Sequence, residues 1–136
     1  MRQVIVATHG GLSKGLQSTL SMIVGQNVAE TIVTYSLQPG MDATDFTVAI
    51  KKEMDSSIDY VILTDILGGS VDNALSTLLE YDNVWLISGV NLIMLLEIVL
   101  SENPNTNDVC QNALENAKSG MNLRKTVVEF NGDEEF

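Results

Sequence analysis

The stretch QVIVATHGGLSKGL at residues 3–16 contains the alternation on which the fold depends. Its first five residues, QVIVA, form a short apolar run rich in β-branched side chains, which is typical of a strand buried on both faces of a parallel sheet. The run stops at the turn THGG, and the leucines that follow recur at helical spacing up to Gly25, a natural helix terminator. The segment therefore predicts a strand, a tight turn and a helix in that order.

The same order recurs along the chain. Strands are predicted at residues 3–7, 30–36, 59–63, 84–87 and 124–130. Helices are predicted at residues 12–24, 43–54, 71–79, 91–99 and 108–119, with Asp42 and Ser70 as N-caps of the second and third. Four strand-then-helix units at a spacing of roughly 25–30 residues are typical of right-handed βαβ connections. We therefore expect a three-layer α/β fold with a mainly parallel, doubly wound sheet.

Length and composition set the limits for this fold. The chain has 136 residues, of which 45% are hydrophobic and 18% charged, a balance typical of one globular domain. We expect a single domain at residues 1–130, followed by an acidic tail at residues 131–136. No run reaches the roughly 18 apolar residues of a membrane helix, and the N-terminus lacks the pattern of a signal peptide. A cytoplasmic protein is the expectation.

Charge and cysteine content exclude several function classes. Seven basic residues against 18 acidic ones give a net charge of −11, which repels nucleic acid but favours a protein partner with a basic docking face. The single cysteine, Cys110, predicts a buried or helix-face thiol without a disulfide. Because the chain also has only one histidine, far from Cys110, we expect neither a metal site nor a cofactor.

Chemistry in such sheets takes place beyond the carboxyl ends of the strands. Here this edge comprises the loops 8–12, 36–41, 64–70 and 88–91. The only histidine, His9, directly follows the first strand, and the segment DILGGS at residues 65–70 directly follows the third. If these two strands are neighbours, an imidazole, a carboxylate and two glycine pairs meet in one crevice.

These groups are suited to covalent phosphoryl transfer through a histidine. A carboxylate from Asp65 that accepts the Nδ1 proton would leave Nε2 of His9 as the nucleophile. The phosphoryl oxygens need donors, which glycine-rich turns and helix N-termini provide. Gly10, Gly11 and Leu12 at one helix start, with Ser70 at another, fit that description.

Each of these residues also has an ordinary structural explanation. A lone histidine is mostly a satisfied structural residue, an aspartate at a strand end caps turns, and Gly-Gly-Ser can be a tight turn before a helix. Other motifs fail on inspection, because the chain contains no Walker loop, no GxGxxG after a strand and no GxSxG elbow.

Three segments carry a resemblance to a known family. VIVATHGGLSKGL at 4–16, LTDILGGSVDNA at 63–74 and SGVNLIMLLE at 88–97 resemble the EIIA component of the mannose family of the bacterial sugar phosphotransferase system, over about residues 1–130. The resemblance implies that His9 is phosphorylated, Asp65 orients it and Ser70 contacts the phosphate. It also places Thr64 in the phosphate-binding site.

The resemblance further implies partners and an assembly. The histidine phosphocarrier protein would donate the phosphoryl group and a separate EIIB component would accept it, while the membrane components EIIC and EIID import the sugar. A homodimer would exchange the antiparallel strand predicted at residues 124–130. Two departures, Val71 and Ile93 where the family often has proline, leave the sugar-specific subgroup open.

Two alternatives remain open at this stage. One is the related phosphotransfer subunit of a dihydroxyacetone kinase, which has a similar fold and a histidine near the N-terminus. The other is a non-catalytic regulatory module of flavodoxin-like shape that holds an anion in the same crevice. A response-regulator receiver is disfavoured, because the first strand ends in Ala7-Thr8-His9 rather than in acidic residues.

Overall fold

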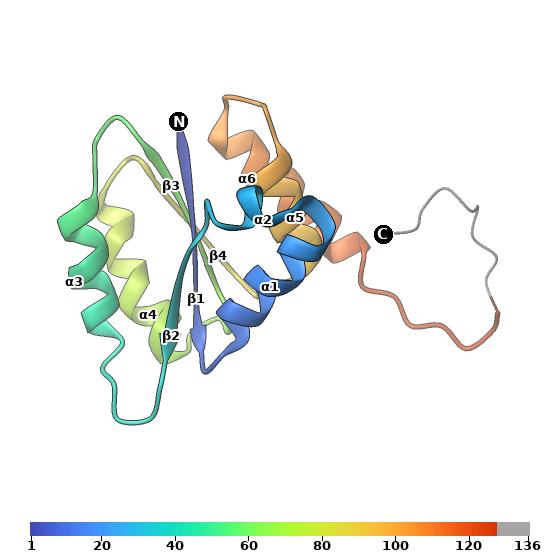
Figure 1. Cartoon of the computed structure of the whole chain (residues 1–136), viewed down its shortest axis with the longest axis horizontal. Helices are drawn as coiled ribbons and strands as arrows, with labels where there is room; N and C mark the ends of the chain where they lie inside the picture. Colours follow the sequence, from blue (N-terminus) through green and yellow to red (C-terminus); the bar gives the residue numbers. More distant parts are fainter. Residues whose placement is uncertain (128–136) are drawn as a thin grey trace.

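Four strands form one parallel sheet, as the strand spacing predicts (Figure 1). The computed structural model describes residues 1–127. The strands are β1 (Arg2–His9), β2 (Val33–Leu37), β3 (Asp59–Thr64) and β4 (Val84–Ser88), and their order in the sheet is β2-β1-β3-β4. The first and third strands are therefore neighbours, which was the condition for the predicted crevice.

Helices cover both faces of the sheet and complete a three-layer α/β fold (Figure 1). They are α1 (Leu12–Val24), α2 (Gln26–Ala29), α3 (Thr44–Glu53), α4 (Ser70–Ser76), the 3₁₀ helix η1 (Thr77–Glu80), α5 (Leu92–Leu100) and α6 (Thr106–Ser119). Helices α1, α5 and α6 pack on one face, and α3 and α4 pack on the other. This arrangement leaves the carboxyl ends of the strands uncovered.

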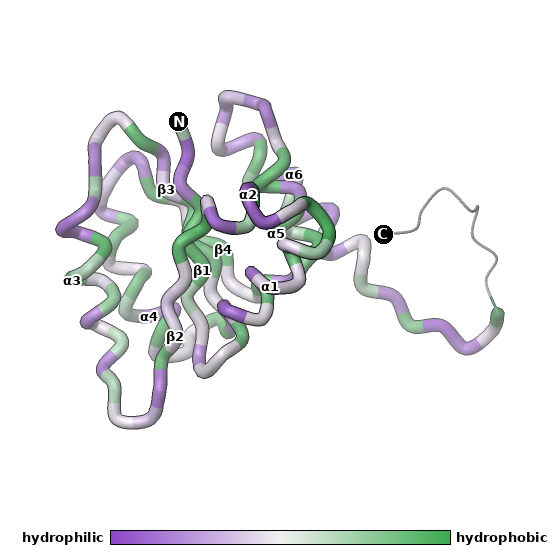
Figure 2. Tube along the Cα trace, in the orientation of Figure 1, coloured by the Kyte–Doolittle hydropathy of each residue, from purple (hydrophilic) through white to green (hydrophobic). Residues whose placement is uncertain are grey.

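Strand β1 contributes to the core on both of its faces. Val4 and Val6 belong to the cluster beneath α1, α5 and α6, whereas Ile5 and Ala7 belong to the cluster beneath α3 and α4. Because successive side chains of a strand point to opposite faces, a continuous apolar run is what a central strand needs. Figure 2 shows hydrophobic residues along the strands at the centre of the molecule, with hydrophilic ones in the outer turns.

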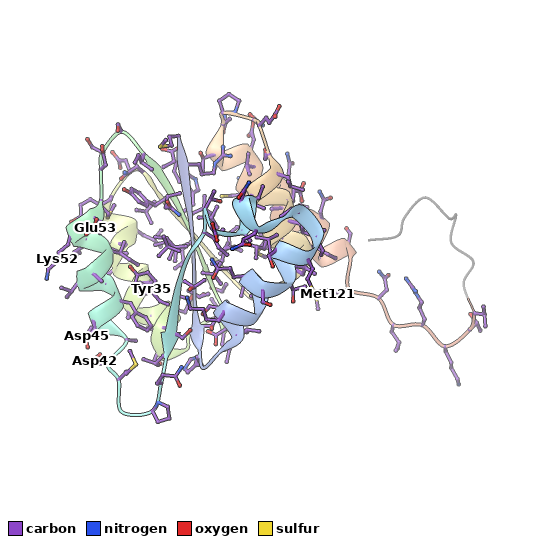
Figure 3. The ribbon with its side chains drawn as sticks, in the orientation of Figure 1. Tyr35, Asp42, Asp45, Lys52, Glu53 and Met121 are labelled. Atoms are coloured by element: carbon purple, nitrogen blue, oxygen red, sulfur yellow. The ribbon has the colours of Figure 1, made fainter. Side chains whose placement is uncertain are left out.

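The edge strand β2 is joined to α3 by aromatic packing. The rings of Tyr35 and Phe46 have centroids 5.1 Å apart, and Figure 3 shows Tyr35 between β2 and the helix. Two causes raise the pKa of Tyr35: burial is the larger, and the nearby carboxylate of Glu53 is the smaller.

The cysteine is buried as expected, and burial raises the pKa of Cys110 to about 11.

Two helices start at asparagine caps. The side chain of Asn91 accepts the N–H of Met94 at 3.1 Å, as expected for the start of α5. Helix α6 begins at Thr106, two residues before the predicted start, because Asn105 accepts the N–H of Asp108 at 3.1 Å. The capping residue, rather than the first charged residue, sets this boundary.

Some predicted boundaries are wrong. The second strand starts at Val33 rather than at residue 30, because the short helix α2 and a turn occupy the residues before it. The third helix was predicted to reach residue 79, but Leu79 belongs to η1 and is half-exposed. Helix α3 starts at Thr44, and Asp42 accepts the N–H of that residue at 2.9 Å without being the N-cap.

Ser70 is not the N-cap of α4. It is the first residue of the helix, Gly69 occupies the cap position, and no side chain caps this end. The extended backbone of Gly69, with φ −70° and ψ 170°, turns the chain into the helix without a capping hydroxyl. The hydroxyl of Ser70 therefore remains available for another partner.

The C-terminal predictions lie mostly outside the described residues. The structure describes residues 121–127 and shows no strand there. The remainder of the strand predicted at 124–130 lies outside the described residues. The same holds for the acidic tail at 131–136, so the exchanged strand and the domain boundary stay predictions. Within residues 1–127, no helix has the length and apolar character needed to cross a membrane.

Candidate active site around His9

The sheet brings His9 and Asp65 into direct contact. His9 ends β1, and Asp65 is the first residue after β3, the strand beside it. One oxygen of the carboxylate, Asp65 Oδ2, accepts the backbone N–H of His9 at 2.9 Å and lies 2.9 Å from His9 Nδ1. The two contacts fix both the main chain and the ring of the histidine.

The carboxylate determines which ring nitrogen carries the proton. The side chain of Asp65 is 8% exposed, whereas that of His9 is 44% exposed. Burial on its own would raise the pKa of Asp65, but hydrogen bonds from the main chain and ring of His9 outweigh it and lower this pKa. An ionised carboxylate only accepts hydrogen bonds, so Nδ1 carries a proton and Nε2 of the neutral ring has a free lone pair.

Ser70 lies on the other side of the ring. Its Oγ is 3.2 Å from His9 Nε2, and the residue is exposed. Space is limited at position 69, because a Cβ there would lie 3.3 Å from the carbonyl oxygen of Ile66, a tight contact, and 3.5 Å from Cε1 of His9, an ordinary one. Gly68 has a φ of +78°, a conformation that L side chains rarely adopt. Both glycines belong to the turn that leads into Ser70, whose hydroxyl lies beside Nε2.

Two of the predicted backbone donors are free. Within residues 1–127, the N–H groups of Gly11 and Leu12 have no protein acceptor, and both lie at the start of α1. The N–H of Gly10 is different, because it donates to the carbonyl oxygen of Leu37 at 2.8 Å. Gly10 instead contributes a φ of +54°, which turns the chain sharply away from β1 after His9.

The hydroxyl of Thr64 bonds to a side chain other than His9. The residue is fully buried, and its hydroxyl donates to Asp72 Oδ1 at 2.5 Å. The structure therefore brings together His9, Asp65 and Ser70 of the predicted side chains, but directs the hydroxyl of Thr64 to a different carboxylate.

Asp72 is a buried acidic residue near the site that the sequence pattern did not predict. Only 5% of it is exposed, and its carboxylate accepts hydrogen bonds from Thr64, from Ser88 Oγ at 2.7 Å and from the N–H of Gly68 at 3.0 Å. Burial would raise its pKa, but these three donors together lower it. The signal in the sequence was weak: an aspartate in the first turn of a helix, with hydroxyl residues at two strand ends.

Apolar side chains surround the histidine on the open edge. Leu12, Ile66 and Leu67 are 49%, 58% and 81% exposed, and they belong to the two loops that form the site. Exposed apolar residues grouped around a polar centre are typical of a protein contact surface. In the part of the chain that the structure describes, no three His, Cys, Asp or Glu residues are grouped as metal ligands would be.

Comparisons with known proteins show the family to which the chain belongs. Residues 3–114 match the EIIA-man family model, described as the PTS system fructose IIA component, where PTS is the phosphotransferase system. Component EIIA of the phosphotransferase system from Streptococcus agalactiae is similar, with 30% identity, a TM-score of 0.78, and coverage of 89% of this chain and 95% of that one. The IIA protein associated with the fucose utilization operon of Streptococcus pneumoniae has 31% identity, a TM-score of 0.69, and coverage of 89% and 96%.

A third solved structure shares the fold at lower identity. The mannose/sorbose-specific IIA subunit from Enterococcus faecalis has 21% identity, a TM-score of 0.79, and coverage of 95% of this chain and 98% of that one. The family model spans both loops that meet at His9. The chain belongs to the EIIA-man family, the mannose- and fructose-family IIA components of the sugar phosphotransferase system.

Proposed function

We propose that this IIA component accepts a phosphoryl group on Nε2 of His9 and passes it on. The observation that carries the proposal is the orientation of the ring. Nδ1 is held by the nearly buried carboxylate of Asp65, while Nε2 is on the exposed side beside Ser70 Oγ. The ring is thereby prepared as a nucleophile before any partner arrives.

In this step the phosphoryl group moves from a phosphohistidine of the donor protein to His9. The lone pair of His9 Nε2 attacks phosphorus, a new N–P bond forms, and the N–P bond of the donor's phosphohistidine breaks to release its imidazole. The proton on Nδ1 stays in its hydrogen bond to Asp65, whose negative charge offsets the positive charge that the ring gains. Because the bonds formed and broken are alike, the step is nearly isoenergetic and depends on positioning and charge complementation.

Donors for the phosphoryl oxygens are available around Nε2. The N–H groups of Gly11 and Leu12 begin α1, where the helix dipole favours an anion, and the hydroxyl of Ser70 can rotate from the ring to a phosphoryl oxygen. Thr64 has no such freedom while it donates to Asp72. We therefore assign the phosphate contacts to Gly11, Leu12 and Ser70.

The partners follow from the same assignment. The histidine phosphocarrier protein is the proposed donor and a separate EIIB component the proposed acceptor, which in turn serves the membrane components EIIC and EIID. Each partner must reach Nε2, so it must contact the exposed apolar residues Leu12, Ile66 and Leu67 around it. A homodimer that exchanges the strand at 124–130 is part of the same proposal.

The test is a phosphorylation assay with the purified chain. Incubation with phosphoenolpyruvate and the general donor proteins should add the mass of one phosphoryl group, which acid should remove because phosphohistidine is acid-labile. His9→Ala, in the only histidine of the chain, should abolish the addition and leave the circular dichroism spectrum unchanged. An unmodified wild-type chain would favour a regulatory module, and transfer only with dihydroxyacetone kinase subunits would favour that pathway.

A further inference from the structure

The carboxylate of Asp72 has no part in the phosphoryl transfer described above, yet it is the most highly connected buried acid near the site. It accepts hydrogen bonds from β3 through Thr64, from β4 through Ser88, and from the loop between Asp65 and Ser70 through the N–H of Gly68. Burying an ionised carboxylate is costly unless several donors compensate for the lost water. Such an arrangement needs a reason beyond the stability of one helix.

We propose that Asp72 is a positioning residue, which holds the loop 65–70 so that Asp65 and Ser70 stay on opposite sides of the His9 ring. This inference rests on the proposed function, since it concerns the geometry of the same nucleophile. Asp72 itself makes no hydrogen bond to His9, and it acts through Gly68, the middle of the loop.

The loop is held at Gly68 by both of its backbone groups. Asp72 Oδ2 accepts the N–H of Gly68 at 3.0 Å, and the amide of the next residue, Asn73 Nδ2, donates to the carbonyl oxygen of Gly68 at 2.9 Å. Both side chains come from the first turn of α4, which Ser70 begins. A shift of Gly68 would therefore displace Ser70 and the loop together.

The other end of this connection is fixed in the sheet. Thr64 and Ser88 are paired residues at the carboxyl ends of β3 and β4, and both hydroxyls donate to the same oxygen, Asp72 Oδ1. The carboxylate thus links two strand ends to the loop through its two oxygens. The arrangement also keeps the hydroxyl of Thr64 from the phosphoryl group, which leaves Ser70 as the hydroxyl beside Nε2.

Removing this link should change rate rather than affinity. A displacement of about 1 Å in a reacting group can cost as much as 10²-fold in rate. We expect Asp72→Ala to slow phosphoryl acceptance by roughly 10- to 100-fold. The donor concentration that gives the half-maximal rate should not change, because the exposed residues that contact the donor are the same.

A conservative variant separates hydrogen bonding from bulk packing. In Asp72→Asn, the amide oxygen can accept the N–H of Gly68 while its NH₂ donates to the hydroxyls of Thr64 and Ser88, which rotate to accept. This variant should recover most of the rate lost in Asp72→Ala. The matched control is Asp108→Ala, another aspartate in the first turn of a helix, but exposed and in α6, which starts at the opposite end of the sheet.

The experiment has two readouts on the full chain. The first is single-turnover phosphoryl acceptance over a range of donor concentrations. The second is the ¹⁵N NMR spectrum of the His9 ring, which reports the tautomer and hydrogen bonding of Nδ1 and Nε2 without any partner. For Asp72→Ala we expect a slower rate and displaced ring resonances, whereas Asp108→Ala should match the wild type in both.

The outcomes distinguish this inference from the proposed function. If the wild type accepts no phosphoryl group, the proposed function fails, and displaced ring resonances in Asp72→Ala would still support the positioning. Wild-type rate and ring resonances in a folded Asp72→Ala would overturn it. If that variant does not fold, Asn73→Ala serves instead, because its side chain is exposed; a smaller loss in the same two readouts is expected, and wild-type values would overturn the proposal.

Discussion

The hydroxyl of Ser70 contacts the His9 ring and does not cap the helix that Ser70 begins. A serine at a helix start commonly caps a backbone N–H, and the sequence pattern predicted that role. In the structure the residue lies one position further along, inside the helix, and its hydroxyl faces His9 Nε2. A hydroxyl that caps nothing contributes little to helix stability, so stability and activity should respond separately to its removal.

The variant Ser70→Ala tests this separation. Its unfolding free energy should stay within about 0.5 kcal/mol of the wild type, since no cap is lost. Phosphoryl acceptance should fall by about 10-fold or more, because a hydrogen bond to a charged oxygen contributes about 1.5–3 kcal/mol. Urea denaturation and single-turnover assays measure the two effects. Ser76→Ala, at the other end of α4, is the control and should not change the transfer rate; a cap-sized loss of stability at Ser70 with normal transfer would contradict the assignment.

The second prediction concerns how the contribution of Asp65 to the stability of the fold depends on pH. The pKa of Asp65 lies below its ordinary value of about 3.9 in the folded chain. A depressed folded-state pKa stabilises the fold above the unfolded-state pKa, and this stabilisation is lost as pH falls through the folded-state pKa. The wild type should therefore be more stable than Asp65→Asn at pH 7 and pH 5, and the difference should shrink below about pH 4.

The pH comparison is made by urea denaturation of both proteins at each pH. The same variant should slow phosphoryl acceptance, because an amide can neither offset the charge of the phosphorylated ring nor hold its tautomer as firmly. A stability difference that grows on acidification below pH 4, or an unchanged transfer rate, would refute the orienting role of this carboxylate.

Among the elements, α5 and α6 begin in the same way. Each is capped by an asparagine that accepts one backbone N–H at 3.1 Å, although α5 starts beside the active-site edge and α6 at the opposite end. Loss of such a cap costs about 1 kcal/mol in measured helices. Because the two caps share no partner, their contributions should be independent.

We expect Asn91→Ala and Asn105→Ala each to lower the unfolding free energy by about 1 kcal/mol, and the double variant to lower it by the sum of the two effects. Equilibrium denaturation of the three proteins measures this. Asn122→Ala is the control, because the amide of Asn122 donates to the carbonyl oxygen of Ser119, the last residue of α6, and caps no helix start. A double variant no less stable than either single one would show that the caps are not independent.

The elements also show what the sequence could and could not predict. The central strands were predicted closely because QVIVA and DYVIL are apolar on both faces, a pattern that only a two-sided core satisfies. Helix α2 was missed because four residues are too few for a periodic signal, and it displaced the start of the edge strand β2. Local sequence determined the central strands, whereas packing set the boundaries at the edge.

The same distinction applies to the site. His9 and Asp65 were predictable as a pair because parallel strands place their carboxyl ends together. Thr64 and Asp72 were not, because a buried hydroxyl and a buried carboxylate find each other only after the helix has packed on the sheet. Sequence position predicted that His9 and Asp65 meet, whereas tertiary packing decided that Ser70, and not Thr64, has its hydroxyl beside the ring.

For the whole molecule, the decisive features are an acidic charge and an open edge. The net charge is −11, while the loops that contain His9 and Asp65 expose three large apolar residues, Leu12, Ile66 and Leu67. Charge outside a contact surface acts at long range and raises the rate of encounter with a basic partner, whereas apolar contacts hold the complex briefly once it has formed. The two contributions respond differently to salt.

Phosphoryl transfer from the histidine phosphocarrier protein should therefore be sensitive to ionic strength in its second-order rate. Salt at 0.15 M shortens the screening length to about 8 Å, and at 1 M to about 3 Å, so the second-order rate should fall steadily over this range. The rate at saturating donor should change little, because the step within the complex depends on buried or directly bonded groups such as Asp65. Stopped-flow or quench-flow assays at several donor concentrations separate the two rates, with a neutral osmolyte as the control for water activity. A second-order rate that is constant or rises with salt would mean that the acidic surface does not guide the encounter. The exposed apolar residues Leu12, Ile66 and Leu67 would then select the partner alone.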